Sequence, residues 1–554
     1  MARRIFFLQA VIMLCTCSLS AQTPEWVRSV GDSTGNTLIH AMSVCQTSHI
    51  LFAGSFDGRS LILGSETLKN AGREDAFAAV LDEAGNVSWA SSFGGSGEDI
   101  ATAIACDNIG NIYVAMNFGS LSITIGSNTL FNRGESDGAL IKLNAEKEVE
   151  WVWHLGNAGK DEITGVVTDR QGNIYVSGYT IDGIGPRQAT AFVVKMDDAK
   201  NILWQRKGAG GDVQLTSIVL DDDQNCYLAG SVWDRVTFDG GYELRSGMAR
   251  NAFIVQYSPA GSFMKGVLDS NYSKINAMVS HSNSIYAAGE KVNMYMGWGW
   301  PLMDSKIILT KYDQNLDISW EAFAGGETEG QSLDVVNDIA VDESGNLYMT
   351  GYYFSENIAF GQDTLENIWN RNYFYQQVFV LKYDSSGQPI WGKSLGGDMN
   401  DRGTVIAVVG EDAFFLGGNF ESDRIHFGQY VLINEGSTRE IYVHLRPPRY
   451  GRNPISFLAH YHTAIASVTP PGAHVLATLY PNPAKEYFNI RPHVSTGYSG
   501  TLHIYTIDGR LIHTQTIQPT ETDIRVSTGM MHTGVYLLAI TIGNHVEVHR
   551  FVRH

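Results

Sequence analysis

Short runs in which apolar and polar residues alternate recur along this chain. Examples are "DGALIKLN" from Asp137 and "QVFVLKYD" from Gln377. A period of two over about six residues is that of a half-buried β-strand. We therefore predict an all-β protein built from repeats. Seven runs of this kind begin at Asp75, Asp137, Thr190, Asn251, Lys306, Gln377 and Glu440.

A second pattern, close to D-x-x-G-N-x-Y, keeps step with these runs. It is clearest in "DRQGNIYVSGY" from Asp169 and "DESGNLYMTGY" from Asp342. We interpret it as a tight turn between the innermost strand of a repeat and its neighbour, in which Asp and Asn bond the local backbone and Gly takes positive φ. Successive copies lie 52 to 67 residues apart, which indicates a repeat architecture. The aromatic residue of each copy is Phe52, Tyr113, Tyr175, Tyr227, Tyr286, Tyr348 or Phe415.

A third pattern is a strand centred on Trp, and its order along the chain is informative. The first copy, at Trp26, precedes every other motif, and the last repeat has no copy of its own. Four-stranded units of fixed period predict a seven-bladed β-propeller, in which the Trp26 strand completes the last blade and closes the ring. An open β-solenoid is the alternative, but it needs no displaced first strand. The other copies are Trp89, Trp151, Trp204, Phe263, Trp320 and Trp391.

The chain divides into four segments. Residues 1–21 carry two arginines, a short apolar run and small residues, which is the layout of a secretory signal peptide. Leu14 and Thr16 are poor residues to precede an acylated cysteine, which disfavours a lipoprotein. We assign residues 22–446 to the propeller and the Pro-rich residues 447–473 to a linker. Residues 474–554 alternate without a helical period and predict a small C-terminal β-sandwich.

Composition and charge exclude several classes of protein. The formal net charge of −19 repels nucleic acid and anionic lipid, so we expect no nucleic-acid partner. The mature chain is predicted to contain no transmembrane segment. Cys45, Cys106 and Cys226 would remain after signal-peptide removal, an odd number unlike a disulfide framework. Because Cys45 and Cys106 hold equivalent positions in neighbouring repeats, we interpret them as small buried hydrophobic residues.

The repeat resembles that of the secreted β-propeller repeat proteins of the Bacteroidetes. The shared pattern is "D-x-x-G-N-x-Y-V-x-G" followed by "D-x-F-x-x-K-x-D-x-x-G-x-x-x-W-x-x-x-x-G-G", and it extends over about residues 22–446. The tail resembles the C-terminal sorting domain of the type IX secretion system, in "LYPNPAKEYFNI" from Leu479, "LHIYTIDGRLI" from Leu502 and "TGVYLLAITIGNHVEVHRFV" from Thr533. That resemblance implies export by the Sec pathway, passage across the outer membrane with the type IX machinery as partner of residues 474–554, and removal of the tail.

A search for catalytic chemistry finds no nucleotide-binding, zinc-protease or nucleophile-elbow motif, so we assign no catalytic residue, metal or cofactor. In a propeller, the long connections between the second and third strands open on one face, and function concentrates on such loops. Carboxylates follow the Trp strands on this face and are interpreted either as caps of Gly-Gly turns or as a cation or acid-base site. They are Asp32, Glu98, Asp99, Asp161, Glu162, Asp212, Glu327, Asp398 and Asp401. "DDDQN" at Asp221 resembles a calcium loop only by charge.

Aromatic residues depart from the repeat in two of these loops. "NMYMGWGWPLMD" and "ENIWNRNYFYQQ" occupy corresponding positions, which we assign to blades four and six. Exposed aromatic rings suit sugars or protein anchors, whereas the alternative is that they cover the blade tops as local core. The predicted ligand-binding residues are Tyr295, Trp298, Trp300, Trp369, Tyr373 and Tyr375.

Three hypotheses follow. The first is an exported propeller that binds a glycan or a surface protein, at the cell surface or released. The second is an extracellular hydrolase or lyase that uses carboxylates on the same face. The third is a structural scaffold of the cell surface. A carboxylate pair converging on the central channel favours catalysis, whereas solvent-exposed aromatic rings without such a pair favour binding.

Overall fold

The computed structural model divides into two compact units, of which the larger spans Pro24–His462. The described residues are β-strands, turns and irregular segments without a helix. They are residues 24–31, 35–45, 49–82, 84–181, 189–296, 301–326, 333–367, 375–411, 413–428, 430–436, 438–441, 449–462, 477–480, 487–492, 500–506, 511–517, 524–528, 531, 534–542 and 545–553.

Antiparallel pairing groups the strands of the larger unit into sets of four, which we number as blades from their inner strands. Blade 1 is β2 (Thr37–Cys45), β3 (His49–Phe56), β6 (Asp75–Leu81) and β7 (Val87–Phe93). Blade 2 is β8 (Asp99–Cys106), β9 (Ile112–Phe118), β12 (Asp137–Leu143) and β13 (Val149–Leu155). Blade 3 is β14 (Lys160–Thr168), β15 (Ile174–Ile181), β16 (Ala189–Met196) and β17 (Ile202–Gly210). Blade 4 is β18 (Val213–Leu220), β19 (Cys226–Phe238), β20 (Tyr242–Tyr257) and β21 (Phe263–Asp269). Blade 5 is β22 (Lys274–His281), β23 (Ser284–Met296), β24 (Pro301–Tyr312) and β25 (Ile318–Gly325).

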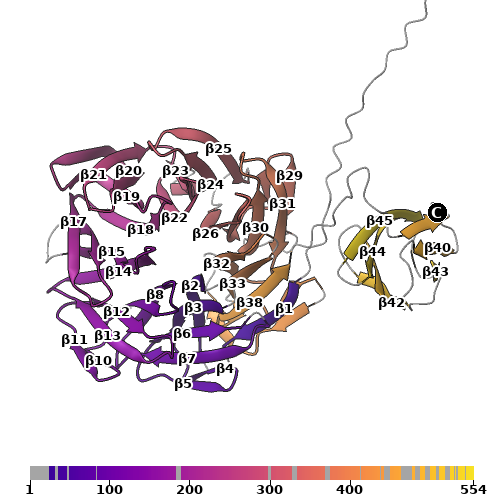
Figure 1. The fold of residues 1–554 in the computed structure, drawn as a ribbon, viewed down its shortest axis with the longest axis horizontal. Helices are drawn as coiled ribbons and strands as arrows, with labels where there is room; N and C mark the ends of the chain where they lie inside the picture. Colours follow the sequence, from indigo (N-terminus) through magenta and orange to yellow (C-terminus); the bar gives the residue numbers. More distant parts are fainter. Residues whose placement is uncertain are drawn as a thin grey trace, which may run out of the picture. The chain divides into compact units, whose positions relative to one another are not determined.

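Blade 6 is β26 (Val335–Val341), β27 (Leu347–Tyr353), β30 (Gln377–Tyr383) and β31 (Pro389–Leu395), and blade 7 is β32 (Asp401–Val409), β33 (Ala413–Phe420), β38 (Ile455–His462) and β1 (Pro24–Val30). Each inner strand contacts the inner strand of the next blade, and β32 contacts β2, so the circle is closed. Figure 1 shows the inner strands around the middle of the propeller. The predicted order of inner, Tyr, Phe-Val-Lys and Trp strands is correct.

Ring closure follows the prediction for the N-terminal strand but not for its partner. β1 pairs with β38, with Val27 opposite Ala459. The third strand of blade 7 is therefore β38, and the prediction of a strand from Glu440 in this position is wrong. β36 (Thr438–Ile441) pairs instead with β37 (Arg449–Arg452), within a longer insertion between β33 and β38. The segment interpreted as a linker thus contributes a strand to the propeller sheet.

The long connections between second and third strands fold mostly into hairpins rather than into loops over one face. They are β4 (Ser60–Leu63) with β5 (Glu66–Lys69), β10 (Ser122–Ile125) with β11 (Asn128–Phe131), β28 (Asn357–Phe360) with β29 (Asp363–Glu366), and β34 (Arg424–Phe427) with β35 (Tyr430–Ile433). In blades 4 and 5 the second and third strands themselves extend. Figure 1 places β4–β5 and β10–β11 at the outer edge of the propeller. The prediction that these connections form long loops over one face is therefore wrong for these four blades.

These hairpins lie along the outer strands. A Cβ on Gly126, at the β10–β11 turn, would come within 3.2 Å of Val149, the first residue of β13 in the same blade. On their other side the hairpins reach the preceding blade, because β28 pairs with β25 and the extension of β19 pairs with β17. Each such hairpin therefore braces its own blade and the one before it.

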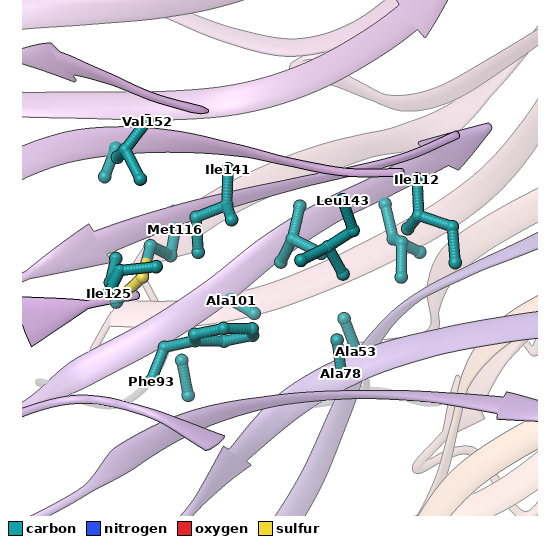
Figure 2. Packing of buried hydrophobic residues seen from close by; sticks show 14 of the residues in the cluster. Ala53, Ala78, Phe93, Ala101, Ile112, Met116, Ile125, Ile141, Leu143 and Val152 are labelled. Carbon is teal, nitrogen blue, oxygen red and sulfur yellow. The ribbon is translucent and has the colours of Figure 1, made fainter. Parts of the chain in front are cut away.

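The core lies between adjacent blades. Between blades 1 and 2, small side chains of blade 1 such as Ala53 and Ala78 face Ile141 and Leu143 of blade 2, and Ile125 closes the outer end of the layer (Figure 2). Small residues opposite large ones let the two twisted sheets pack without voids.

A disulfide joins Cys45 of β2 to Cys106 of β8, with the two Cα atoms 5.9 Å apart. The sequence-based interpretation of these cysteines as unpaired apolar residues is wrong. The reason is that equivalent positions on adjacent inner strands face each other across the blade interface. Cys226, the third cysteine, is free and buried.

The smaller unit is a sandwich of two sheets. One sheet has the order β39 (Ala477–Tyr480), β40 (Tyr487–Pro492), β43 (Ile524–Ser527), and the other β42 (Leu511–Ile517), β41 (Gly500–Thr506), β44 (Gly534–Ile542), β45 (His545–Arg553). Phe488 and Ile490 from the first sheet and Leu502 and Leu538 from the second share one buried core. None of the described residues forms a helix that is long and apolar enough to span a membrane.

Candidate functional site

The recurrent Asp-Asn turn is structural, as predicted. Asp169 accepts hydrogen bonds from the backbone N–H and the side-chain amide of Asn173, both at 2.8 Å, and Gly172 has φ of 81°. The same arrangement occurs at Asp221, where Asn225 donates both bonds, which accounts for the calcium-like "DDDQN" sequence. Within the described ranges, no three His, Cys, Asp or Glu side chains are grouped to hold a metal ion.

Three of the carboxylates predicted on one face, Asp99, Asp161 and Asp401, accept hydrogen bonds from nearby turns. Asp99 accepts the N–H of Gly95 at 2.7 Å and the hydroxyl of Ser120 at 2.6 Å, and Asp401 accepts the N–H of Gly397 and the hydroxyl of Ser422. Asp161 accepts the N–H of Asn157. For these residues, the turn-capping interpretation is confirmed. Asp334 does the same with Gly326 and was missed in the sequence.

The remaining predicted carboxylates have different environments. Glu98 pairs with Arg73 at the surface, at 2.8 Å, Asp212 pairs with Arg250, and Glu162 accepts the Tyr179 hydroxyl and pairs with Lys160. Asp398 is exposed, and Asp32 and Glu327 lie outside the described residues. These carboxylates therefore do not gather into one group.

The predicted aromatic residues belong to neighbouring blades 5 and 6, not to blades four and six. Tyr295 lies in β23 with its backbone opposite Leu302, and Trp298, Trp300, Trp369 and Tyr373 lie outside the described residues. Tyr375 is 6% exposed, so its ring belongs to the local core, as the alternative interpretation predicted. This burial argues against its assignment as an exposed ligand-binding residue.

A ring of polar side chains lines the inner strands. Each inner strand has a β-bulge at the same position, where the bulged residue is His40, Thr102, Thr164, Thr216, Asn276, Asn337 or Thr404. Several of these side chains bond the backbone of the next blade: Thr102 donates to the Ile163 carbonyl at 2.8 Å, and Asn337 to the Gly403 carbonyl at 2.7 Å. The ring thus ties the blades together around the channel.

Glu290, Tyr352 and Arg402, which we call the mouth cluster, approach one another from three successive blades. The Arg402 guanidinium lies over the Tyr352 ring, 5.2 Å from its centroid, and its Nε donates to Oε1 of Gln376. The Glu290 carboxylate accepts the side-chain N–H of Asn276 at 2.5 Å. Arg402 lies on the inner strand β32, just before its bulge. Glu290 and Tyr352 lie on the second strands β23 and β27, opposite the first residues of the inner strands β22 and β26.

Two members of the mouth cluster, Glu290 and Tyr352, have raised pKa values. Burial raises the pKa of Glu290 to about 7, although Lys274 and Asn276 oppose the shift. Burial also raises the pKa of Tyr352, where the Arg402 charge acts against the shift and the Glu290 charge adds to it. A buried carboxyl with a raised pKa and a nearby charge, here that of Lys274, is a recognised sign of a functional site.

Glu290 and Tyr352 could have been noticed in the sequence, because they occupy the position that directly follows the repeat motif. The residue that pairs near the start of each inner strand directly follows the Gly at the end of the Tyr-strand motif, or Met116 in blade 2, and the motif does not include it. These residues are Ser55, Asn117, Tyr179, Ser231, Glu290, Tyr352 and Asn419, among which Glu290 is the acid.

A separate hollow lies at the rim between blades 5 and 6. Its volume is about 540 Å³, and it is lined by Lys306, Phe323 and Asn357 with the backbone around Gly325 and Gly361. It sits where β25 pairs with β28. Because only two of its lining side chains are polar, those of Lys306 and Asn357, we do not treat it as the functional site.

Comparisons with known proteins identify both parts of the chain. The secretion system C-terminal sorting domain matches residues 478–554, and the β-propeller repeat matches residues 150–185 and 328–352. A comparison with curated proteins finds no match.

Three solved structures are similar at a level that shows nothing about ligands. A duf4221 family member from Bacteroides vulgatus has 10% identity and a TM-score of 0.30, covering 67% of this chain and 98% of its own. A xylan β-1,4-xylosidase from Bacillus halodurans has 8% identity and a TM-score of 0.28, covering 78% and 100%. An arabinoxylan arabinofuranohydrolase from Bacillus subtilis has 9% identity and a TM-score of 0.25, covering 94% and 92%.

The matched regions agree with the architecture. The propeller repeats fall on blades 3 and 6 with their flanking strands, and the sorting domain falls on the C-terminal sandwich. The chain is thus an exported β-propeller repeat protein with a type IX secretion C-terminal sorting domain, which directs it across the outer membrane to the cell surface or the extracellular space.

Proposed function

We propose that this chain is a non-catalytic binding protein whose propeller holds an extracellular glycan at the channel mouth of blades 5 to 7. The observation that carries the proposal is the convergence of Glu290, Tyr352 and Arg402 from three successive blades. Charged and hydroxyl groups beside an aromatic ring suit a sugar, whose hydroxyls need polar partners and whose apolar face needs a flat surface.

The aromatic segments of blades 5 and 6 continue directly from this cluster along the chain. β23 contains Glu290 and runs on to Tyr295, and Gln376, which holds Arg402, follows Tyr375. We propose that Tyr295, Trp298, Trp300, Trp369 and Tyr373 extend the binding surface. A protein ligand remains the alternative for these residues, since exposed aromatic rings also anchor protein interfaces.

A hydrolase on the same face is the second candidate function. The raised pKa of Glu290 favours it, because a carboxyl that stays protonated near neutral pH can act as a general acid. Glycoside hydrolysis ordinarily needs two carboxyl groups flanking the bond. Asp99, Asp161 and Asp401 are occupied by backbone amides, so binding without turnover is the better-supported proposal.

A polysaccharide array with residues 22–554 tests the proposal, alongside the Trp298→Ala, Trp300→Ala, Trp369→Ala triple variant. We expect saturable binding that the triple variant weakens. Trp233→Ala is the matched control, because Trp233 is an exposed tryptophan of blade 4, 47% accessible, outside the proposed surface. Absence of any glycan binding would favour a protein partner or a scaffold role. New reducing ends in the bound samples would favour the hydrolase.

A further inference from the structure

Blades 3 and 6 carry a tyrosine at the same position of their second strands, β15 and β27, but in different surroundings. Tyr179 pairs with Glu162, and its hydroxyl donates to the Glu162 carboxylate. Tyr352 pairs with Val335, which offers no side-chain acceptor. Within the described residues, the Tyr352 hydroxyl has no hydrogen-bond partner. The repeat thus contains one satisfied tyrosine and one whose hydroxyl is open to a ligand.

Arg402 is held by an aromatic ring and a side-chain amide rather than by an ion pair with a described carboxylate. Its guanidinium stacks on Tyr352, and its Nε is held by Gln376, which is itself buried. Among the described residues, no carboxylate pairs with Arg402. A guanidinium with Nε occupied keeps two terminal nitrogens, which form the fork that binds a carboxylate with two parallel hydrogen bonds.

The neighbouring groups suit the rest of a sugar ring. Asn276 and Glu290 lie on the adjacent blade, joined by a hydrogen bond from the Asn276 amide, whose second N–H goes to the Val336 carbonyl. The Asn276 carbonyl oxygen and the other Glu290 oxygen are left as polar partners for sugar hydroxyls. The inner-strand backbone offers little to an extended peptide, because the bulge side chains already bond backbone carbonyls such as Val336 and Gly403. Peptide binding by strand addition needs free backbone groups.

We infer that the mouth cluster recognises the carboxylate of an acidic sugar, such as a uronic acid residue, with Arg402 binding the carboxylate and the Tyr352 hydroxyl donating to it. This inference rests on the proposed glycan-binding function and specifies its ligand class. The class is an anionic polysaccharide, although the protein as a whole carries a formal net charge of −19.

The test compares polygalacturonate with its methyl ester, using residues 22–554. The methyl ester keeps the sugar ring but removes the charge. We expect the unmodified chain to prefer the free acid, and Arg402→Ala to weaken that binding about 10- to 100-fold, the scale of one lost charge-assisted interaction. Tyr352→Phe should weaken it by about 3- to 10-fold, the scale of one hydrogen bond.

Two matched variants serve as controls. Tyr179→Phe removes the equivalent hydroxyl in blade 3, and Arg424→Ala removes an exposed arginine from β34 of blade 7. Both should bind like the unmodified chain, and thermal melts should show that Arg402→Ala is folded.

Several outcomes would overturn the inference. Equal binding of the acid and the ester, or full binding by Arg402→Ala, would show that a carboxylate is not recognised there, while glycan binding itself would stand. Equal binding of poly-glutamate would show recognition of charge rather than of a sugar. If neither acidic nor neutral glycans bind, the proposed function fails together with the inference.

Discussion

At the residue scale, a tryptophan of one blade fits against a glycine of the next. The indole of Trp320 lies on Gly387, and its Nε1 donates to the Ser385 carbonyl in the same turn, at 3.3 Å. Trp204 with Gly261 and Trp26 with Gly85 repeat the contact. Glycine is therefore needed in this turn for two reasons. It adopts the positive φ of the turn, and it leaves room for the tryptophan of the neighbouring blade.

Gly387→Ala should cost more stability than Gly172→Ala. Both residues have φ near 80°, but a Cβ on Gly387 would lie 2.7 Å from the Trp320 ring, whereas a Cβ on Gly172 meets nothing within 4 Å. The backbone penalty alone is about 1 kcal/mol, and we expect about 2–4 kcal/mol for Gly387→Ala with the overlap included. Urea unfolding of the two variants measures the difference, and equal losses would show that the contact is unimportant.

Glu290 should make stability depend on pH near neutrality. Its folded pKa of about 7 exceeds the ordinary 4.5, so folding favours the protonated form, and stability falls as pH rises from about 4.5 to 7. Glu290→Gln removes this cost. The variant should be more stable than the unmodified chain by about 1–3 kcal/mol at pH 8 and about equal at pH 4. A constant difference across this range would contradict the assigned environment.

Residues that repeat from blade to blade could be predicted from the sequence. Residues that depart from the repeat were predicted less well. Turn, Trp and Phe-Val-Lys positions are visible because periodicity marks them. Glu290 and Arg402 stand at positions whose residue varies from blade to blade, so no repeated residue marks them, and only the closed ring brings them together. Candidate residues on loops were easier to notice, yet Tyr375 among them proved to be buried.

At the element scale, the rim hairpins were the main feature missed. Strands such as Ser122–Ile125 and Asn128–Phe131 have four residues each, too short for alternation to stand out from a loop. The two residues between them, Gly126 and Ser127, are a hairpin turn signal that was available. The hairpins matter because outer strands are sheet edges, and a bound hairpin covers such an edge.

The Cys45–Cys106 disulfide should stabilise the junction of blades 1 and 2. It closes a loop of 61 residues, for which the chain-entropy account gives about 2–4 kcal/mol. The Cys45→Ala, Cys106→Ala double variant should lose this amount in urea unfolding without reductant. Adding dithiothreitol should destabilise the unmodified chain but not the variant, and an equal response in both would argue against the bond. An extracellular destination fits a disulfide.

At the scale of the whole molecule, the propeller depends on strands from both of its ends. β1 pairs with β38, and β38 pairs with β33, so the last blade needs residues far apart in the sequence. Sequence periodicity predicted the first of these strands, because its Trp repeats a motif. It misplaced the second, because the insertion with β36 and β37 separates β38 from its repeat.

Truncation should expose this dependence. Residues 22–462 contain every strand of the propeller and should unfold in one cooperative transition. Residues 22–446 lack β38, which leaves β1 and β33 without their shared partner, and this fragment should melt at lower temperature or aggregate. Circular dichroism melts compare the two, and identical melting would show that β38 is dispensable.

The measurement that tests the account most directly follows binding and turnover in the same samples. The best polysaccharide from the array is titrated into residues 22–554 and into the Arg402→Ala variant, and reducing ends are quantified at each point. We predict saturable binding by the unmodified chain, a loss of affinity of about tenfold or more in the variant, and an unchanged ligand. Release of sugar products, or equal affinity of the two proteins, would contradict a non-catalytic binding site at the channel mouth.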